Sequence, residues 1–130
     1  MKIKIHLCAV CSLFLVACAS QPTAPQVFTM AQFGAVGDGV RNDAPALKKA
    51  FQALEHAGEP ATLLFQKKTY RLGKQDGNDA QFDFSGMENI EVDGQGATLI
   101  IHPVHGVARF FNSRNITFKN FVIQHDPLPF

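Results

Sequence analysis

Hydrophobic and polar residues alternate with a period of two along most of the chain after Pro60. Such alternation is typical of β-strands with one buried face, and Gly, Asn, Asp and Ser separate the successive runs as turn residues do. The runs form three sets of short strands, whose apolar positions are Leu63/Phe65, Tyr70/Leu72 and Phe82/Phe84, then Ile90/Val92, Leu99/Ile101 and Val107, then Ile116/Phe118, Phe121 and Ile123. The pattern predicts an all-β domain.

The strand sets repeat at a regular interval. Residues 88–94 align with residues 114–120 at a shift of 26, and Leu63 precedes Ile90 by 27. A repeat of about 20–50 residues indicates a repeat architecture. Three strands per repeat fit one coil of a parallel β-helix, in which neighbouring coils stack and share one core.

Stacking at a shift of 26 makes specific predictions about neighbours. Ile90 should lie directly above Ile116 in the interior. Asn89 and Asn115 should occupy equivalent corners, where their amides can stack and bond backbone groups. We interpret both asparagines as structural residues.

The stretch that precedes these strands has the pattern of one amphipathic helix. Its apolar positions recur at intervals of three and four, at Leu47, Ala50, Phe51, Leu54 and Ala57. Asn42 or Asp43 can cap it, Pro45 suits its first turn, and Gly58 ends it. We expect its apolar face to cover the first coil as a cap.

A glycine turn comes before this helix. Gly34, Gly37 and Gly39 stand within six positions, which indicates backbone conformations that a Cβ atom would obstruct, and Asp38 lies among them. The spacing is not that of a dinucleotide-binding loop, and no Gly-Lys-Ser/Thr follows. We interpret the segment as a structural turn.

Residues 1–17 read as an export signal. Lys2 and Lys4 precede an apolar run, Leu7–Ala17, that is too short to span a bilayer as a helix. The run ends in Leu-Val-Ala-Cys18, which resembles a bacterial lipoprotein signal with Cys18 as the lipid attachment site. Ala19 after that cysteine favours the outer membrane. The alternative is cleavage after Ala19, which would leave a periplasmic or secreted protein.

The rest of the chain divides into a flexible tether at 18–27, rich in polar residues and proline, and a domain at 28–130. Without residues 1–17 the chain has ten basic and eleven acidic residues. This near-neutral charge gives no electrostatic reason to bind nucleic acid. Cys18 would be the one remaining cysteine, so no intramolecular disulfide can form.

One segment resembles a known family. Phe33–Asp43 is similar to the opening motif of right-handed parallel β-helix proteins of the pectin-lyase type. These include polygalacturonase-like glycoside hydrolases, pectate-lyase-like proteins and bacterial α-1,3-galactosidases. The resemblance implies a right-handed single-stranded parallel β-helix, with about three N-terminal coils capped by one amphipathic α-helix.

The same resemblance implies a function. In these enzymes the N-terminal coils are scaffold and the catalytic carboxylates lie on later coils. We therefore expect 28–130 to be a fragment of a longer domain, inactive alone, from a secreted carbohydrate-active enzyme. A glycoside hydrolase acting on a polysaccharide or oligosaccharide is the first interpretation. The alternatives are a polysaccharide lyase, and a non-catalytic surface glycan-binding β-helix or degenerate remnant.

Two pairs of residues are candidates for acid–base catalysis. Glu91 and Asp93 point outward from one strand, but their counterparts one coil later are Thr117 and Lys119, so no carboxylate cluster is expected. The catalytic residues remain unknown, and the candidates are His125 and Asp126, which could serve in acid–base work or simply form a polar turn.

Metal and cofactor sites are not indicated. His102 and His105 could be metal ligands, but no third ligand stands near them in the sequence. The sequence implies no nucleotide, haem or redox cofactor and no calcium site. The expected partners are a carbohydrate substrate and, through Cys18, a membrane.

Overall fold

A computed structural model describes residues 24–58, 60–74, 77 and 79–127. The predicted export signal, Cys18 and residues 18–23 of the predicted tether lie outside the described residues. The first strand, β1 (Gln26–Thr29), begins two residues before the expected start of the domain at 28. Within the described ranges, no helix reaches the length and apolarity that a membrane crossing requires.

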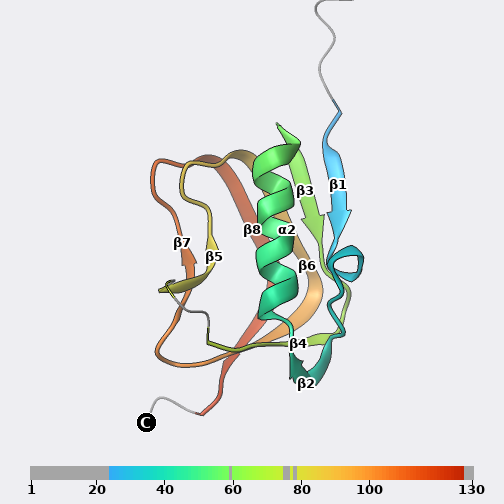
Figure 1. Cartoon of the computed structure of the whole chain (residues 1–130), viewed down its shortest axis with the longest axis vertical. Coiled ribbons are helices and arrows are strands. Elements are labelled where there is room, and N and C mark those ends of the chain that lie inside the picture. The colour runs from blue at the N-terminus through green and yellow to red at the C-terminus, as the bar shows by residue number, and fades with distance from the viewer. Residues whose placement is uncertain (1–23, 59, 75–76, 78, 128–130) are drawn as a thin grey trace, which may run out of the picture.

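The described strands pair in parallel, and most of them form one curled sheet. They are β1, β2 (Asp38–Asn42), β3 (Ala61–Leu64), β4 (Thr69–Leu72), β5 (Ala80–Asp83), β6 (Glu88–Ile101), β7 (Gly106–Arg109) and β8 (Arg114–His125). β6 pairs with β3 through its first half and with β4 through its second half, while β8 pairs with both halves of β6. β5 and β7 form a separate pair. Successive passes of the chain therefore lie on one another (Figure 1).

The register confirms the shift of 26 between the second and third strand sets. Ile90 pairs with Ile116 and Val92 pairs with Phe118, so these side chains lie directly above one another. β5 and β7 keep the same shift, because Ala80 pairs with Gly106.

The predicted shift of 27 between Leu63 and Ile90 is wrong. Ala61 pairs with Ile90 and Leu63 pairs with Val92, a shift of 29. The cause lies in the connection after β4. Leu72 and Ala80 are eight positions apart, whereas their partners Ile101 and Gly106 are five apart.

One α-helix covers part of this sheet. α2 (Ala44–Ala57) follows a 3-10 helix, η2 (Met30–Phe33), and has Pro45 in its first turn and Gly58 after its last residue. Its buried side chains include Leu47, Phe51 and Leu54. Figure 1 shows α2 in front of the sheet, between β5 on one side and β3 on the other.

The interior is filled mainly by aromatic rings and aliphatic side chains from the alternating positions. Phe82 on β5 is fully buried and contacts Phe51 on α2 and Phe118 on β8, at ring-centroid distances of 5.9 and 4.9 Å. Edge-on and tilted ring pairs of this kind add to the stabilisation from apolar burial. A single core therefore joins the helix, the first strand set and β8.

Candidate functional site

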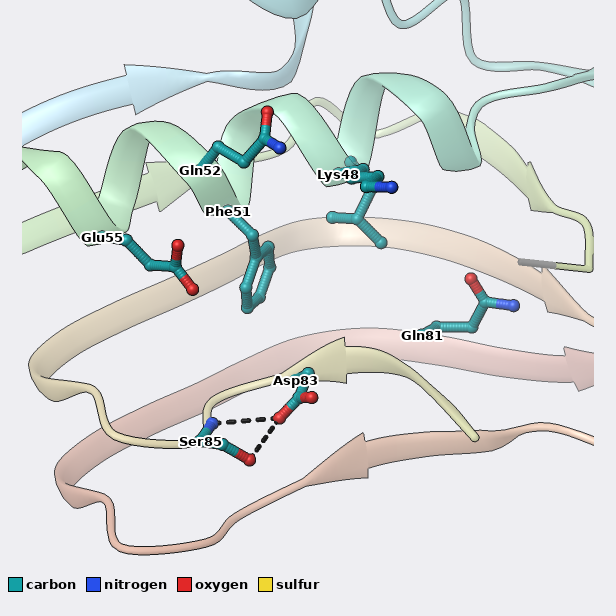
Figure 2. Close-up of a pocket in the computed structure, with 8 residues that line it drawn as sticks. Lys48, Phe51, Gln52, Glu55, Gln81, Asp83 and Ser85 are labelled. Carbon is teal, nitrogen blue, oxygen red and sulfur yellow. Dashed lines mark hydrogen bonds between the residues drawn. The ribbon is translucent and has the colours of Figure 1, made fainter. Parts of the chain in front are cut away.

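A cluster of polar and apolar side chains lines a groove between α2 and β5. The groove encloses about 320 Å³, within the range of about 300–1,000 Å³ typical of ligand pockets. It is lined by Leu47, Lys48, Phe51, Gln52, Glu55, Gln81, Asp83 and Ser85. In Figure 2 the Phe51 ring and the Glu55 carboxylate extend from the helix toward the strand, whereas the Asp83 carboxylate lies on the side of the strand away from the helix, beside Ser85.

The Asp83 carboxylate at this groove has partners on two sides. Its Oδ1 accepts hydrogen bonds from the backbone N–H (3.0 Å) and the hydroxyl of Ser85. Its Oδ2 lies 2.7 Å from the Arg109 guanidinium, which is in register with it on β7. Burial raises the pKa of Asp83, but the hydrogen bonds from Ser85 and Arg109 outweigh it and hold that pKa below the ordinary value of 3.8. At neutral pH Asp83 is therefore an acceptor and not a proton donor.

A second hollow continues the groove toward the end of α2. It also encloses about 320 Å³ and shares Glu55 and Ser85 with the first. Its further lining includes Gly58 after the helix and Glu88 at the start of β6. Glu88 Oε1 accepts a hydrogen bond from Arg114 at 2.6 Å. The two hollows together make one elongated groove along the helix.

The predicted pair His125 and Asp126 lies at the far end of β8. His125 is in register with Ile101 and is partly buried, and its Nδ1 has no hydrogen-bond partner among the described residues. The Asp126 carboxylate lies 3.1 Å from the Arg71 guanidinium. The described contact of this carboxylate therefore ties β8 to β4.

The outward carboxylates on β6 also have cationic partners. Lys119 Nζ lies 3.1 Å from Glu91 and 4.0 Å from Asp93, and Asn120 donates a hydrogen bond of 2.9 Å to Asp93. The Asn120 hydrogen bond is the largest cause that lowers the pKa of Asp93, and Glu91 raises the pKa of Lys119. As the sequence predicted, Thr117 is the register partner of Glu91, and a lysine stands where a third acid would be needed.

The two histidines of the β6–β7 turn lie near each other. The ring centroids of His102 and His105 are 6.2 Å apart. His105 is 8% exposed, and neither of its ring nitrogens has a hydrogen-bond partner among the described residues. The described part of the chain contains no group of three or more His, Cys, Asp or Glu residues that could hold a metal ion.

The glycine turn is held by a buried carboxylate. Asp43 is 2% exposed and accepts hydrogen bonds of 2.9 Å from the backbone N–H groups of both Val36 and Gly37. Gly37 has φ of +69°, and a Cβ atom there would approach the Lys68 side chain to 2.8 Å. Gly34 and Gly39 also have positive φ. The segment is therefore a tight structural turn fastened from inside.

The expected capping of α2 takes a different form. The Asp43 side chain makes no capping bond, because it is bound to the turn. Asn42 Oδ1 accepts the Ala44 N–H at 3.0 Å and also the Gly73 N–H at 2.8 Å, which joins the helix start to the end of β4. The Asp38 carboxylate accepts hydrogen bonds from the Val40 and Arg41 N–H groups of its own turn. These hydrogen bonds lower the pKa of Asp38.

The corner asparagines are bonded to each other. Asn115 Nδ2 donates to Asn89 Oδ1 at 2.6 Å, and both residues have φ of +55°. Asparagine tolerates this left-handed conformation better than most residues. The pair links neighbouring coils at the corner where β6 and β8 begin.

Sequence reasoning missed the groove along α2. The periodic pattern gives no reason to single out Glu55 on the polar face of the helix, or Asp83, which stands between the apolar positions Phe82 and Phe84. One signal was available: Asp83 and Arg109 stand 26 residues apart, the same shift as the repeat, as do Glu88 and Arg114.

Part of this chain is similar in sequence to a known enzyme. No family model matches the chain. Its sequence is similar to that of a galactosidase, a kind of glycoside hydrolase. That relative is alpha-1,3-galactosidase B of Phocaeicola vulgatus, which is 28% identical over 119 residues, or 78% of this chain and 20% of the relative. The chain thus spans about a fifth of the length of the curated relative that it matches.

Proposed function

We propose that residues 28–130 form the N-terminal scaffold of an exported carbohydrate-active enzyme, a glycoside hydrolase that acts on a galactose-containing glycan. The fold we propose is a right-handed parallel β-helix of the pectin-lyase type, with α2 as the cap of its first coil. The observation that carries the proposal is the in-register stacking of Ile90 on Ile116, combined with the similarity to alpha-1,3-galactosidase B over 78% of the chain.

The charges on the described coils support a scaffold role. Glycoside hydrolysis needs two carboxyl groups about 5–9.5 Å apart, one of them available as a proton donor or nucleophile. Four carboxylates of these coils are instead bound by cations, namely Asp83, Glu88, Glu91 and Asp126 by Arg109, Arg114, Lys119 and Arg71. We therefore propose that this chain is inactive alone and that the catalytic acids belong to other coils of the enzyme.

The proposed location rests on the sequence. A lipid on Cys18 would fix the domain to the outer membrane through the tether, and cleavage after Ala19 would release it to the periplasm or the medium. Mass spectrometry of the mature N-terminus separates the two, because only the first form carries acyl chains on Cys18.

A chimera tests the function. This chain replaces the matching fifth of alpha-1,3-galactosidase B, and galactose release from an α-1,3-galactoside is measured for the chimera and for this chain alone. We expect release by the chimera and none by the chain. The control is the galactosidase that lacks the fifth altogether, which should be inactive.

Three results would contradict the proposal or part of it. Galactose release by this chain alone would refute the scaffold role. Unsaturated products from pectin would indicate the polysaccharide lyase alternative. A chimera that folds and binds the glycan without cleaving it would favour the non-catalytic glycan-binding β-helix.

A further inference from the structure

β8 has one edge that no described strand covers. Along its other edge it pairs in parallel with β6, with register partners from Arg114 to His125. No other described strand pairs with it. An edge strand presents a row of backbone N–H and C=O groups that can pair with a further strand, and natural proteins often keep such strands short. β8 is 12 residues long, so it offers an extended edge for association.

The inward side chains along this edge are apolar and incompletely covered. Four residues of β8 point into the interior, because their register partners on β6 are buried; the four are Ile116, Phe118, Phe121 and Ile123. Ile123 is 40% exposed, and the other three are only partly buried. In a stack of coils, an inner coil is covered by neighbours on two sides. A second covering layer would therefore remove more apolar surface from water here.

The order of these four residues is the same in both directions along β8. They read Ile, Phe, Phe, Ile, with spacings of two, three and two positions. If two copies of β8 run antiparallel about the middle of this set, Ile116 of one copy lies opposite Ile123 of the other. Phe118 then lies opposite Phe121. Aromatic and β-branched pairs across neighbouring strands stabilise a sheet, so the apolar sequence of β8 is complementary to itself.

The shape of β8 is compatible with this pairing. Asn120 has φ of +63°, a left-handed conformation that interrupts the extended backbone. The residues before it pair with the first half of β6 and those after it pair with the second half, so β8 has two arms. The Phe118 and Phe121 rings stack where the arms meet, with centroids 4.5 Å apart. A two-fold axis through this point exchanges the arms and keeps the interior on the same side of both copies.

The cation nearest this axis is neutralised within each copy. The antiparallel pairing brings the two Lys119 residues near each other, and two bare cations in contact would oppose association. Lys119 Nζ, however, lies 3.1 Å from Glu91 and 4.0 Å from Asp93 of its own chain. Each lysine therefore approaches its counterpart together with carboxylates that offset its charge.

We propose that β8 is the interface of a symmetric dimer of this chain, in which two β8 edges pair antiparallel and the apolar ends of the two stacks form one core. A symmetric contact of this kind closes after two copies. The inference goes beyond the proposed function and uses a surface that a further coil would occupy in the proposed enzyme. A second copy therefore covers β8 wherever no further coil does.

Light scattering of the full chain over a range of concentrations tests the number of copies. We expect the mass of two chains at high concentration and a fall toward one chain on dilution, because association depends on protein concentration. A mass that stays at one chain would overturn the inference. A mass that keeps rising with concentration would also overturn it, since head-to-tail contacts between β8 and β1 form open assemblies.

A pair of cysteines tests the register. In the proposed pairing Thr117 of one copy lies opposite Val122 of the other, at the Cα separation of about 5 Å typical of antiparallel partners, which a disulfide spans. Within one chain these residues are five positions apart along the strand, too far to bridge. Under oxidation, Thr117→Cys/Val122→Cys should give a disulfide-linked dimer on non-reducing electrophoresis, with the bridge mapped by mass spectrometry of the joined peptides.

The matched control is Thr117→Cys/Gln124→Cys, whose second cysteine replaces another exposed residue two positions further along β8. Its bridge between positions 117 and 124 should be at least about fivefold less abundant, because diagonal neighbours lie beyond the reach of a disulfide. Equal yields from the two pairs, or a dimer in which no bridge joins positions 117 and 122, would overturn the inference.

The chimera keeps this test apart from the proposed function. If the chimera releases galactose while this chain stays monomeric, the inference fails and the proposed function stands. If this chain forms the bridged dimer and the chimera is inactive, the dimer stands and the enzymatic proposal fails.

Discussion

β6 and β8 have the same alternation of apolar residues, but their inward side chains are buried to different extents. Leu99 on β6 is 0% exposed, whereas its register partner Ile123 on β8 is 40% exposed. Val92 is also fully buried, and its partner Phe118 is only partly buried. β6 lies between β3 and β4 on one side and β8 on the other, whereas β8 pairs with β6 alone among the described strands.

This difference in burial separates the effect of the apolar alternation from the effect of neighbouring coils. The period of two decides which side chains point inward, but neighbouring coils decide how much of each is removed from water. Because burial contributes roughly 25 cal/mol per Å² of apolar surface, equal residues in neighbouring coils make unequal contributions to stability. The stability of such a stack is concentrated in its inner coils.

The largest expected effect comes from truncating matched residues of the two coils. Leu99→Ala should lower the free energy of unfolding by about 3 kcal/mol, since it leaves a cavity in a close-packed interior. Ile123→Ala should cost about 1 kcal/mol, because the side chain is already in contact with water. Urea denaturation followed by circular dichroism measures both. Equal losses would show that β8 is covered as completely as β6.

A smaller effect is expected where the chain turns into α2. Asp43→Asn keeps one oxygen but turns the second acceptor into a donor, which leaves the Val36 or Gly37 N–H group without its partner. The expected cost is about 2 kcal/mol. If α2 loosens, the side chains of the first strand set become less completely covered, as those of β8 are. Faster amide hydrogen exchange in the helix should report this loosening.

The control for this change is Asp38→Asn. Asp38 is exposed, and its described side-chain hydrogen bonds stay within its own turn, so the cost should stay below about 1 kcal/mol. If Asp43→Asn and Asp38→Asn lose equal stability, the buried hydrogen bonds of Asp43 have no special role at the start of the helix.

The smallest effect concerns the ion pair that links β5 to β7. Asp83→Asn should cost about 1 kcal/mol near pH 7, since the pair is partly exposed. The folded-state pKa of Asp83 lies below 3.8, so the ionised carboxylate stabilises the fold above that pH. This contribution is lost as the pH falls through the lower folded-state pKa.

The denaturation midpoints of the unmodified chain and of Asp83→Asn, measured from neutral pH down to about pH 3, should therefore converge at the acid end. A constant difference across this range would mean that the loss comes from the shape of the side chain and not from its charge. The conservative variant Arg109→Lys keeps the cation and should show the convergence in weaker form.

The sequence predicted the inward positions and the helix well, because both follow from local periodicity. It predicted the shift of 26 from the similarity of residues 88–94 and 114–120. It was wrong about the first shift because 27 and 29 are both odd, so either one places Leu63 inward. Apolar alternation alone cannot separate registers that differ by two residues.

The candidate site was harder to predict. The groove along α2 exists because Glu55 and Asp83, 28 positions apart, are brought together by packing. The role of Asp43 was missed for a similar reason. Its place before a helix suggested a cap, whereas the fold of the glycine turn brings two N–H groups to its carboxylate. Side-chain roles of this kind depend on tertiary geometry that no short sequence pattern contains.

The unequal shifts between neighbouring strands have a consequence for variation in this domain. From β4 to β5 the first coil uses three more residues than the next coil uses for the corresponding step, yet the strands on both sides remain paired. Changes in length are thus absorbed at corners, and straight segments keep their partners. The corner between Leu72 and Ala80 is where a loop, a tag or a natural insertion can be accommodated while the stack remains intact.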